Sequence, residues 1–139
     1  DAAPAPAPTT PKAAAPAYSQ KVMEILGAPV PGKGKIVFFR PSKFVGGAIG
    51  FIVREGEAEL GKLRSGNYFV IAAQPGKHTY KVHSEAADNT TLEVEEGETY
   101  FVAGSISMGF LVGHPHLAVS TVAAFEEALP KLEPSKPLK

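Results

Sequence analysis

The chain has 139 residues, its 14 Lys and Arg balance 14 Asp and Glu, and it contains no cysteine. This length suffices for one domain with a buried core, and the even charge lacks the basic excess that a nucleic-acid partner requires. The lack of cysteine excludes disulfides, thiolate catalysis, cysteine zinc sites and a cysteine-linked lipid anchor within these residues. The longest apolar run, residues 100–113, is shorter than the ~20 residues of a membrane helix, so we expect no transmembrane segment.

Residues 1–17 are a Pro/Ala-rich arm with five prolines. Proline at this density prevents a regular helix and favours extended polyproline II segments, which commonly serve as spacers in bacterial envelopes. The chain starts with Asp1 and continues with Ala and Pro, as we expect of an exported precursor after removal of its signal peptide. A truncated chain would start in the same way. We predict a periplasmic or secreted protein, with the arm as one of its contact elements.

Residues 18–33 predict a short helix followed by a linker. An apolar stripe marks the helix, and Gly27 and Pro29 end it. The stripe consists of Tyr18, Val22, Ile25 and Leu26. Residues 27–33 have the spacing of a phosphate-binding loop, but Pro29 and Pro31 remove two backbone N–H donors. We therefore interpret them as a helix-to-strand linker.

Residues 34–123 predict an all-β fold, an antiparallel β-sandwich of about seven or eight strands. Short turn signals rich in Gly, Pro, Asn and Asp separate the strands. The predicted strands are residues 35–40, 50–54, 58–63, 67–73, 77–85, 90–95, 98–107 and 116–122. Residues 74–83 and 91–102 alternate polar and apolar positions, which indicates an antiparallel β-meander.

Two of the predicted strands are apolar on both faces, at residues 36–39 and 100–103. Strands that are buried on both sides have this pattern. We therefore expect a helix or a partner to cover one outer face, with residues 18–26 as the nearest candidate. Residues 124–139 are expected to form a short C-terminal helical turn, which Pro130 ends, and a solvated polar tail.

Five motifs occur in order within these strands. They are Phe39-Arg40-Pro41-Ser42-Lys43-Phe44-Val45-Gly46, Gly66-Asn67-Tyr68-Phe69-Val70, Pro75-Gly76-Lys77-His78-Thr79, Gly97-Glu98-Thr99-Tyr100-Phe101-Val102 and Ser107-Met108-Gly109-Phe110. Across residues 34–122 the chain resembles a bacterial domain family of unknown function, number twenty-eight forty-six, and the third motif is also similar to turns of PEGA-type surface sandwiches. The resemblance implies an exported domain, often part of a lipoprotein, without established catalytic residues. Because the chain has no cysteine to lipidate, we expect a soluble periplasmic or secreted form.

His114 and His116 are the candidate metal ligands, since they lie two residues apart with Met108 nearby, and imidazole with thioether would suit copper. His78 and His83 have opposite parity on their predicted strand, so at most one of them could join such a site. Members of the family that the chain resembles often carry basic residues where this chain has His114 and His116. We therefore expect no bound metal and no cofactor, with histidines in surface or capping roles.

The sequence offers no catalytic constellation. Ser105 replaces the first glycine of a nucleophile elbow at residues 105–109, and we expect no helix to follow. The acidic residues around Glu95 lack the spacing of a calcium loop and fit an exposed sheet face. We therefore predict no catalytic residues and a chain that is not an enzyme.

Two glycine-containing loops are the candidate contact surface of the sandwich, because loops on a rigid scaffold often carry recognition. The proposed contact residues are Arg40, Ser42, Lys43, Phe44, Met108, Phe110 and Leu111. The alternative is that both loops fold back and plug the ends of the sandwich.

Together these patterns predict a non-enzymatic, exported interaction or assembly module of the bacterial cell envelope, with a protein partner or self-assembly through the Pro/Ala arm. The alternative is a small-ligand or glycan-binding periplasmic domain. In that case Tyr68, Tyr80 or Tyr100 would serve as a stacking platform.

Overall fold

A computed structural model describes residues 18–42, 49–83, 87–108 and 113–136 of the chain. The described residues form nine strands, two short α-helices and one 3₁₀ helix. The strands are β1 (Gly34–Arg40), β2 (Phe51–Glu55), β3 (Ala58–Leu63), β4 (Asn67–Ala73), β5 (Gly76–His83), β6 (Ala87–Val94), β7 (Thr99–Met108), β8 (Gly113–Val119) and β9 (Glu133–Pro134). The helices are α1 (Gln20–Leu26), α2 (Val122–Ala128) and the 3₁₀ helix η1 (Leu129–Lys131).

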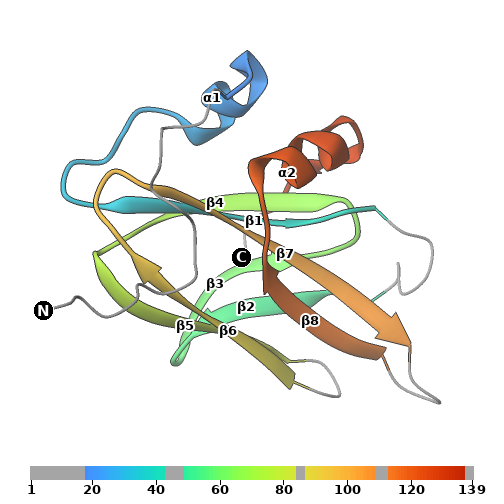
Figure 1. Cartoon of the computed structure of the whole chain (residues 1–139). Coiled ribbons are helices and arrows are strands. Elements are labelled where there is room, and N and C mark those ends of the chain that lie inside the picture. The colour runs from blue at the N-terminus through green and yellow to red at the C-terminus, as the bar shows by residue number, and fades with distance from the viewer. Residues whose placement is uncertain (1–17, 43–48, 84–86, 109–112, 137–139) are drawn as a thin grey trace, which may run out of the picture.

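The strands form two stacked sheets, with the orders β8-β7-β1-β4-β9 and β3-β2-β5-β6. Figure 1 shows the two layers, with α1 and α2 both on the outer side of the five-stranded sheet. The predicted all-β sandwich with short terminal helices is therefore confirmed. β3 and β4 have the predicted bounds, whereas β6 and β8 begin earlier than predicted.

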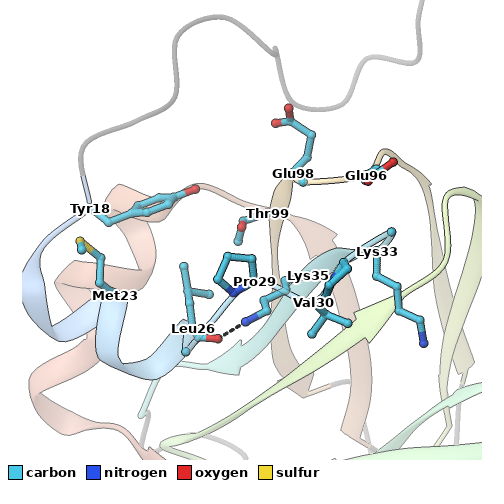
Figure 2. A pocket seen from close by; sticks show the side chains of 14 residues that line it. Tyr18, Met23, Leu26, Pro29, Val30, Lys33, Lys35, Glu96, Glu98 and Thr99 are labelled. Atoms are coloured by element: carbon cyan, nitrogen blue, oxygen red, sulfur yellow. Dashed lines mark hydrogen bonds between the residues drawn. The ribbon is translucent and has the colours of Figure 1, made fainter.

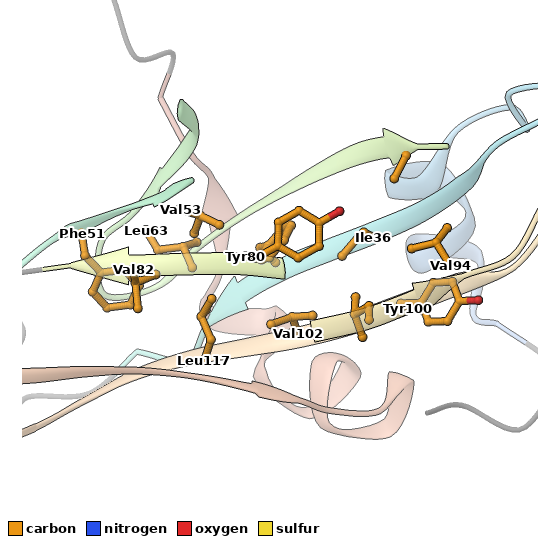
Figure 3. Packing of buried hydrophobic residues seen from close by; sticks show 13 residues of the cluster. Ile36, Phe51, Val53, Leu63, Tyr80, Val82, Val94, Tyr100, Val102 and Leu117 are labelled. Atoms are coloured by element: carbon orange, nitrogen blue, oxygen red, sulfur yellow. The ribbon is translucent and has the colours of Figure 1, made fainter. Parts of the chain in front are cut away.

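The interior between the sheets is apolar because alternate residues of each strand face inwards. β1 contributes Ile36 to this inner core and β7 contributes Tyr100 and Val102, all of them at most 3% exposed. The facing sheet contributes Tyr80 and Val82, and Figure 3 shows these side chains meeting between the layers. The two sheets are thus held together by a continuous apolar interior.

The outer face of the five-stranded sheet carries a second apolar cluster. Val37, Phe39 and Phe101 point away from the inner core, and Val22 of α1 and Phe125 of α2 cover them. The Phe125 ring centroid lies 5.2 Å from that of Phe39 and 5.5 Å from that of Phe101. The prediction that the N-terminal helix covers a doubly apolar strand is confirmed, and α2 is a second cover that the sequence did not predict.

Packing on the sheet holds α1 and α2 in place, because helices of seven residues are too short to be stable alone. A side chain caps each N-terminus. Ser19 accepts a hydrogen bond from the N–H of Val22, and Thr121 accepts one from the N–H of Ala124. Across the described parts of the chain, no helix has the length and apolar character needed to cross a membrane.

Two strand pairs are parallel, which departs from the antiparallel prediction. β1 lies between β4, its antiparallel partner, and β7, its parallel partner. β5 and β6 form the predicted hairpin, but β7 crosses to the other sheet, so the predicted meander was wrong. β7 is apolar on both faces, and the five-stranded sheet is the one with a cover on each side. Polar–apolar alternation alone does not specify which strands pair.

The C-terminal segment is bound to the sheet, whereas the sequence predicted a solvated tail. The N–H of Glu133 donates to the Gly66 carbonyl at 2.9 Å, and that of Ser135 donates to the Tyr68 carbonyl at 2.8 Å. Leu132 packs against the outer cluster. A two-residue strand anchored by one apolar side chain leaves no periodic pattern in the sequence, which is why the prediction was wrong here.

Tyr80 and Tyr100 are both buried in the inner core, but their hydroxyls differ. The Tyr100 hydroxyl accepts a hydrogen bond from the N–H of Glu95 at 2.8 Å. The Tyr80 hydroxyl has no hydrogen-bond partner among the described residues. Burial, followed by the charge of Glu55, raises the pKa of Tyr80, so this hydroxyl stays protonated and unpaired in the core.

We predict that Tyr80→Phe raises the free energy of unfolding by about 1 kcal/mol, because it removes an unpaired buried hydroxyl. Tyr100→Phe is the matched control. It removes the same atom but leaves the Glu95 N–H without that acceptor, so it should lower the free energy of unfolding by about 1 kcal/mol. Urea unfolding followed by circular dichroism measures both, and equal destabilisation by the two variants would contradict the prediction.

Candidate functional site

An accessible apolar groove lies beside α1, where the chain passes from this helix to β1 (Figure 2). Its walls are α1 with the preceding Tyr18, the linker of residues 27–33, and the turn between β6 and β7. This site, the α1 groove, has a volume of about 430 Å³, which falls within the range of ~300–1,000 Å³ typical of ligand pockets. The apolar lining consists of Tyr18, Met23, Leu26, Pro29, Val30 and Pro31.

Lys35 fixes the path of the linker along the groove. Its Nζ donates to the carbonyl oxygens of Leu26 and Ala28, the second at 2.5 Å, and Figure 2 shows the bond to Leu26. The Leu26 carbonyl at the C-terminal end of α1 has no N–H partner within the helix, so the Lys35 ammonium satisfies it. Gly27 ends α1 with a φ of 72°, a conformation that favours glycine. The groove is therefore largely preformed.

Tyr18 closes one side of the groove. Its ring packs edge-on against Phe101, with the ring centroids 6.3 Å apart. Burial raises the pKa of the Tyr18 hydroxyl, a hydrogen bond with Thr99 opposes this rise, and the charge of Glu98 adds to it. The hydroxyl therefore stays protonated at the edge of the groove, where it is available as a hydrogen-bonding group.

Exposed apolar side chains are concentrated at the α1 groove. In the described residues, the large hydrophobic side chains that are exposed are Met23 (56%), Val119 (43%) and Val30 (37%), and both Met23 and Val30 line the groove. The rim carries charges of both signs, from Lys33, Glu96 and Glu98. An apolar groove with an aromatic ring and a charged rim is suited to binding an apolar segment.

The predicted helix-to-strand linker at residues 27–33 is confirmed, since it joins α1 to β1. The sequence did not predict that Pro29 and Pro31 would line a groove. The available signal was that Met23 and Val30 lie outside the apolar stripe of α1 and outside any strand pattern. Each is an apolar residue that neither the helix stripe nor a strand pattern assigns to the core.

Arg40 was predicted to be a contact residue of the first loop, but the structure buries it. It is the last residue of β1 and is 3% exposed. Its guanidinium donates to the carbonyls of Ile49 at 2.6 Å and Leu63 at 3.1 Å, and Cζ lies 5.2 Å from the ring centre of Phe51. Burial lowers the pKa of Arg40. Arg40 therefore ties the end of this loop to the sandwich, and its hydrogen bonds offset the cost of burying it.

The other predicted contact residues stay predictions. Ser42 is exposed at the end of the segment that follows β1. Met108 ends β7, and its side chain lies outside the described residues. The remaining four predicted contact residues lie outside the described residues, namely Lys43, Phe44, Phe110 and Leu111.

The two candidate metal ligands, His114 and His116, lie two residues apart on β8. His114 is half-buried, and the Nε2 of His116 lies 2.7 Å from the Oγ of Ser107 on β7. In the parts of the chain that the structure describes, no group of three or more His, Asp or Glu side chains is arranged to hold a metal ion. His116 is thus engaged in a cross-strand hydrogen bond, and the absence of metal stays a prediction.

Ser107, His116 and Asp88 lie in an order that resembles a hydrolytic triad. The Nδ1 of His116 is 3.9 Å from Oδ2 of Asp88, which is too long for a hydrogen bond. Asp88 Oδ2 instead accepts the N–H of Leu117 at 3.0 Å. The His116 side chain is 47% exposed and does not line the α1 groove. We therefore interpret the trio as a surface hydrogen-bond set that joins β6, β7 and β8.

Of the three tyrosines predicted to stack on a small ligand or glycan, only Tyr68 is accessible. Tyr80 and Tyr100 are at most 3% exposed in the inner core, so they cannot stack on a ligand, and the prediction was wrong for both. Tyr68 is half-buried and lines a second, wider groove of about 680 Å³ together with Lys21 and Leu129. The accessible tyrosines are thus Tyr68 and Tyr18, of which the sequence identified only the first.

His78 connects β5 to two neighbouring segments. Its Nδ1 lies 2.6 Å from Oε2 of Glu55 and its Nε2 lies 2.7 Å from the Gln74 carbonyl. Both partners are acceptors, so both ring nitrogens donate when the ring is protonated. Burial by itself lowers the pKa of His78, but the hydrogen bonds to Gln74 and Glu55 and the charges of Glu55 and Glu93 raise it overall. His78 is therefore a structural ion-pair residue.

The described chain is thus a small β-sandwich domain with a helical layer over one face and a preformed apolar groove beside it. Residues 31–115, more than half of the chain, match the family described as "Protein of unknown function (DUF2846)". The protein belongs to this family, as its five ordered motifs indicated. None of the curated proteins matches the chain.

We predict that Ser107 is not an activated nucleophile. A fluorophosphonate probe should leave the intact mass of the protein unchanged, because His116 is solvated and not oriented by Asp88. Ser107→Ala should change the free energy of unfolding by less than about 0.5 kcal/mol, as surface substitutions usually do. Stoichiometric labelling that Ser107→Ala abolishes would show that the trio is catalytic.

We predict that His78 stabilises the fold in acid more than in base. Because its pKa is raised in the folded state, its contribution is fully present below the unfolded pKa of about 6.5 and is lost as the pH rises through the folded pKa. His78→Gln keeps a hydrogen-bonding side chain that cannot be protonated. Its free energy of unfolding should lie about 1 kcal/mol below that of the parent near pH 6 and approach it near pH 9. Urea titrations at both pH values measure this, and a pH-independent difference would contradict it.

Proposed function

We propose that this protein is a non-enzymatic interaction module of the bacterial cell envelope, which binds an extended apolar segment of a protein in the α1 groove. The observation that carries the proposal is that Met23 and Val30, two exposed large hydrophobic residues, lie together in one preformed groove. Exposed apolar side chains scattered singly need no explanation, whereas a cluster with a charged rim is typical of a contact site.

The dimensions of the groove define the kind of partner that would fit. A volume of about 430 Å³ accommodates a few side chains and not a globular surface. A small contact of this kind falls below the ~1,200 Å² of a stable protein–protein interface. We therefore expect weak binding of a short segment, which becomes strong only when several modules or a tethered partner act together.

Export to the periplasm or the exterior is part of the proposal. It is supported by the Pro/Ala-rich arm of residues 1–17, which has the composition of envelope spacers, and by the family resemblance, which implies an exported domain. The balanced charge of the chain gives no reason to expect a nucleic-acid partner. The described residues contain no transmembrane helix, and none of the 139 residues is a cysteine that could carry a lipid.

The alternative is binding of a small ligand or a glycan. The volume of the α1 groove favours it, and Tyr18 and Tyr68 are the accessible rings that could stack on a sugar. Thermal-shift screening against cell-wall fragments distinguishes the two functions, because a specific ligand raises the unfolding midpoint by mass action. A fragment that raises the midpoint of the parent but not that of Met23→Glu would favour the alternative.

Site-specific crosslinking tests the interaction module. Because the chain has no cysteine, Glu96→Cys gives a single site for a photo-crosslinker on the rim of the groove, and Glu57→Cys gives one on an exposed turn away from it. We expect crosslinks to a second polypeptide in intact cells from position 96 and not from position 57. A chain that is monomeric by native mass spectrometry and forms no crosslink from position 96 would contradict the proposal.

A further inference from the structure

The α1 groove has the features of a surface that recognises proline-rich segments. Such segments adopt polyproline II at a low entropic cost, and the domains that bind them present grooves lined by aromatic side chains. The groove offers the Tyr18 ring, the rings of Pro29 and Pro31, and the exposed side chains of Met23 and Val30. Its chemistry matches an extended chain with an apolar surface and few charges.

The chain itself carries a segment of this kind. Residues 3–8 have the sequence Ala-Pro-Ala-Pro-Ala-Pro and contain no charged residue. The described chain begins at Tyr18, which lines the groove, so residues 9–17 connect the segment to the groove. A linker of nine residues spans at most about 30 Å at ~3.3–3.6 Å per residue, and less where it bends. Residues 3–8 can therefore return to the groove beside the point where the arm begins.

We infer that the α1 groove binds residues 3–8 of the same chain in a polyproline II conformation. The tether raises the effective concentration of the arm to about the millimolar range, which a second copy at micromolar concentration does not reach. Charges of both signs are available for pairing, because the arm carries Asp1 and Lys12 and the rim carries Lys33, Glu96 and Glu98.

This inference rests on the proposed function in that both use the α1 groove. It adds a regulatory consequence, because the arm and an external segment compete for the same apolar surface. A partner then binds only when it displaces the arm, so the affinity that it shows is lowered by the fraction of grooves that the arm occupies.

The two methionines make the inference testable. Met23 lines the groove, whereas Met108 ends β7, whose first residue, Thr99, lies at the groove. At ~3.3 Å per residue the strand places Met108 about 30 Å from the groove. Ala2→Cys gives a single attachment site for a spin label next to residues 3–8. In the full-length protein with isotope-labelled methionine methyl groups, we expect the spin label to broaden the Met23 signal and not the Met108 signal.

Variants of the groove distinguish specific binding of the arm from chance proximity. An unbound arm is still tethered beside the groove, so its spin label would also come near Met23 part of the time. Val30→Asp places a charge in the groove, and Val119→Asp places the same charge at an exposed residue that does not line it. We expect the broadening of the Met23 signal to fall about threefold in Val30→Asp, as the docked population becomes minor, and to persist in Val119→Asp. Equal broadening in the parent and both variants would overturn the inference.

A mixing experiment shows whose arm is bound. Spin-labelled chains without isotope are mixed with isotope-labelled chains that carry no spin label, and we expect no broadening of the Met23 signal. Broadening in the mixture would overturn the assignment to the same chain. The crosslinking of Glu96→Cys reports an external partner by the mass of a second polypeptide, a readout that binding of the arm in the same chain does not produce. If residues 3–8 do not dock, the Met23 signal loses its broadening but the intermolecular crosslink remains. If the proposed function is wrong, the intermolecular crosslink is absent.

Discussion

Strand β1 determines this architecture, because neither of its faces can be left in water. Ile36 and Phe38 face one side and Val37 and Phe39 the other, and all four are at most 1% exposed. Burying a large apolar side chain contributes about 1.5–3 kcal/mol. Exposing one face of β1 would therefore cost an amount comparable with the net stability of a small domain. A second sheet covers one face and two helices cover the other, while β4 and β7 pair with its edges.

The α1 groove is a consequence of that requirement. A helix of seven residues suffices to cover part of the outer face of β1. Because this helix directly precedes β1 in the chain, a linker has to connect the two. The linker of residues 27–33 makes this connection with Lys35 bound to the end of α1, and it leaves Met23 and Val30 beyond the outer cluster. The family match begins at residue 31, so the turn between β6 and β7 belongs to the matched region, whereas α1 and the first part of the linker precede it.

Residue type alone is a poor guide to recognition in this protein. Arg40, Tyr80 and Tyr100 are of the kinds that often bind partners, yet each is buried and stabilises the sandwich. Met23 and Val30 are of the kinds that usually fill a core, yet they are exposed at a groove. What distinguishes the two sets is where the fold places them. The α1 groove therefore offers a partner apolar contact, with charged side chains around it.

Local patterns in the sequence determined the strands, most turns, the short N-terminal helix and the need to cover the doubly apolar strands. Each of these depends on residues that are close together in the chain, because the alternation of apolar side chains specifies which face a strand buries. Only the tertiary structure decided that β7 lies parallel to β1, that β9 joins β4, that Arg40 turns inwards and that Met23 and Val30 line the same groove. Those outcomes depend on packing between segments far apart in sequence, and a periodic pattern carries no information about which segments become neighbours.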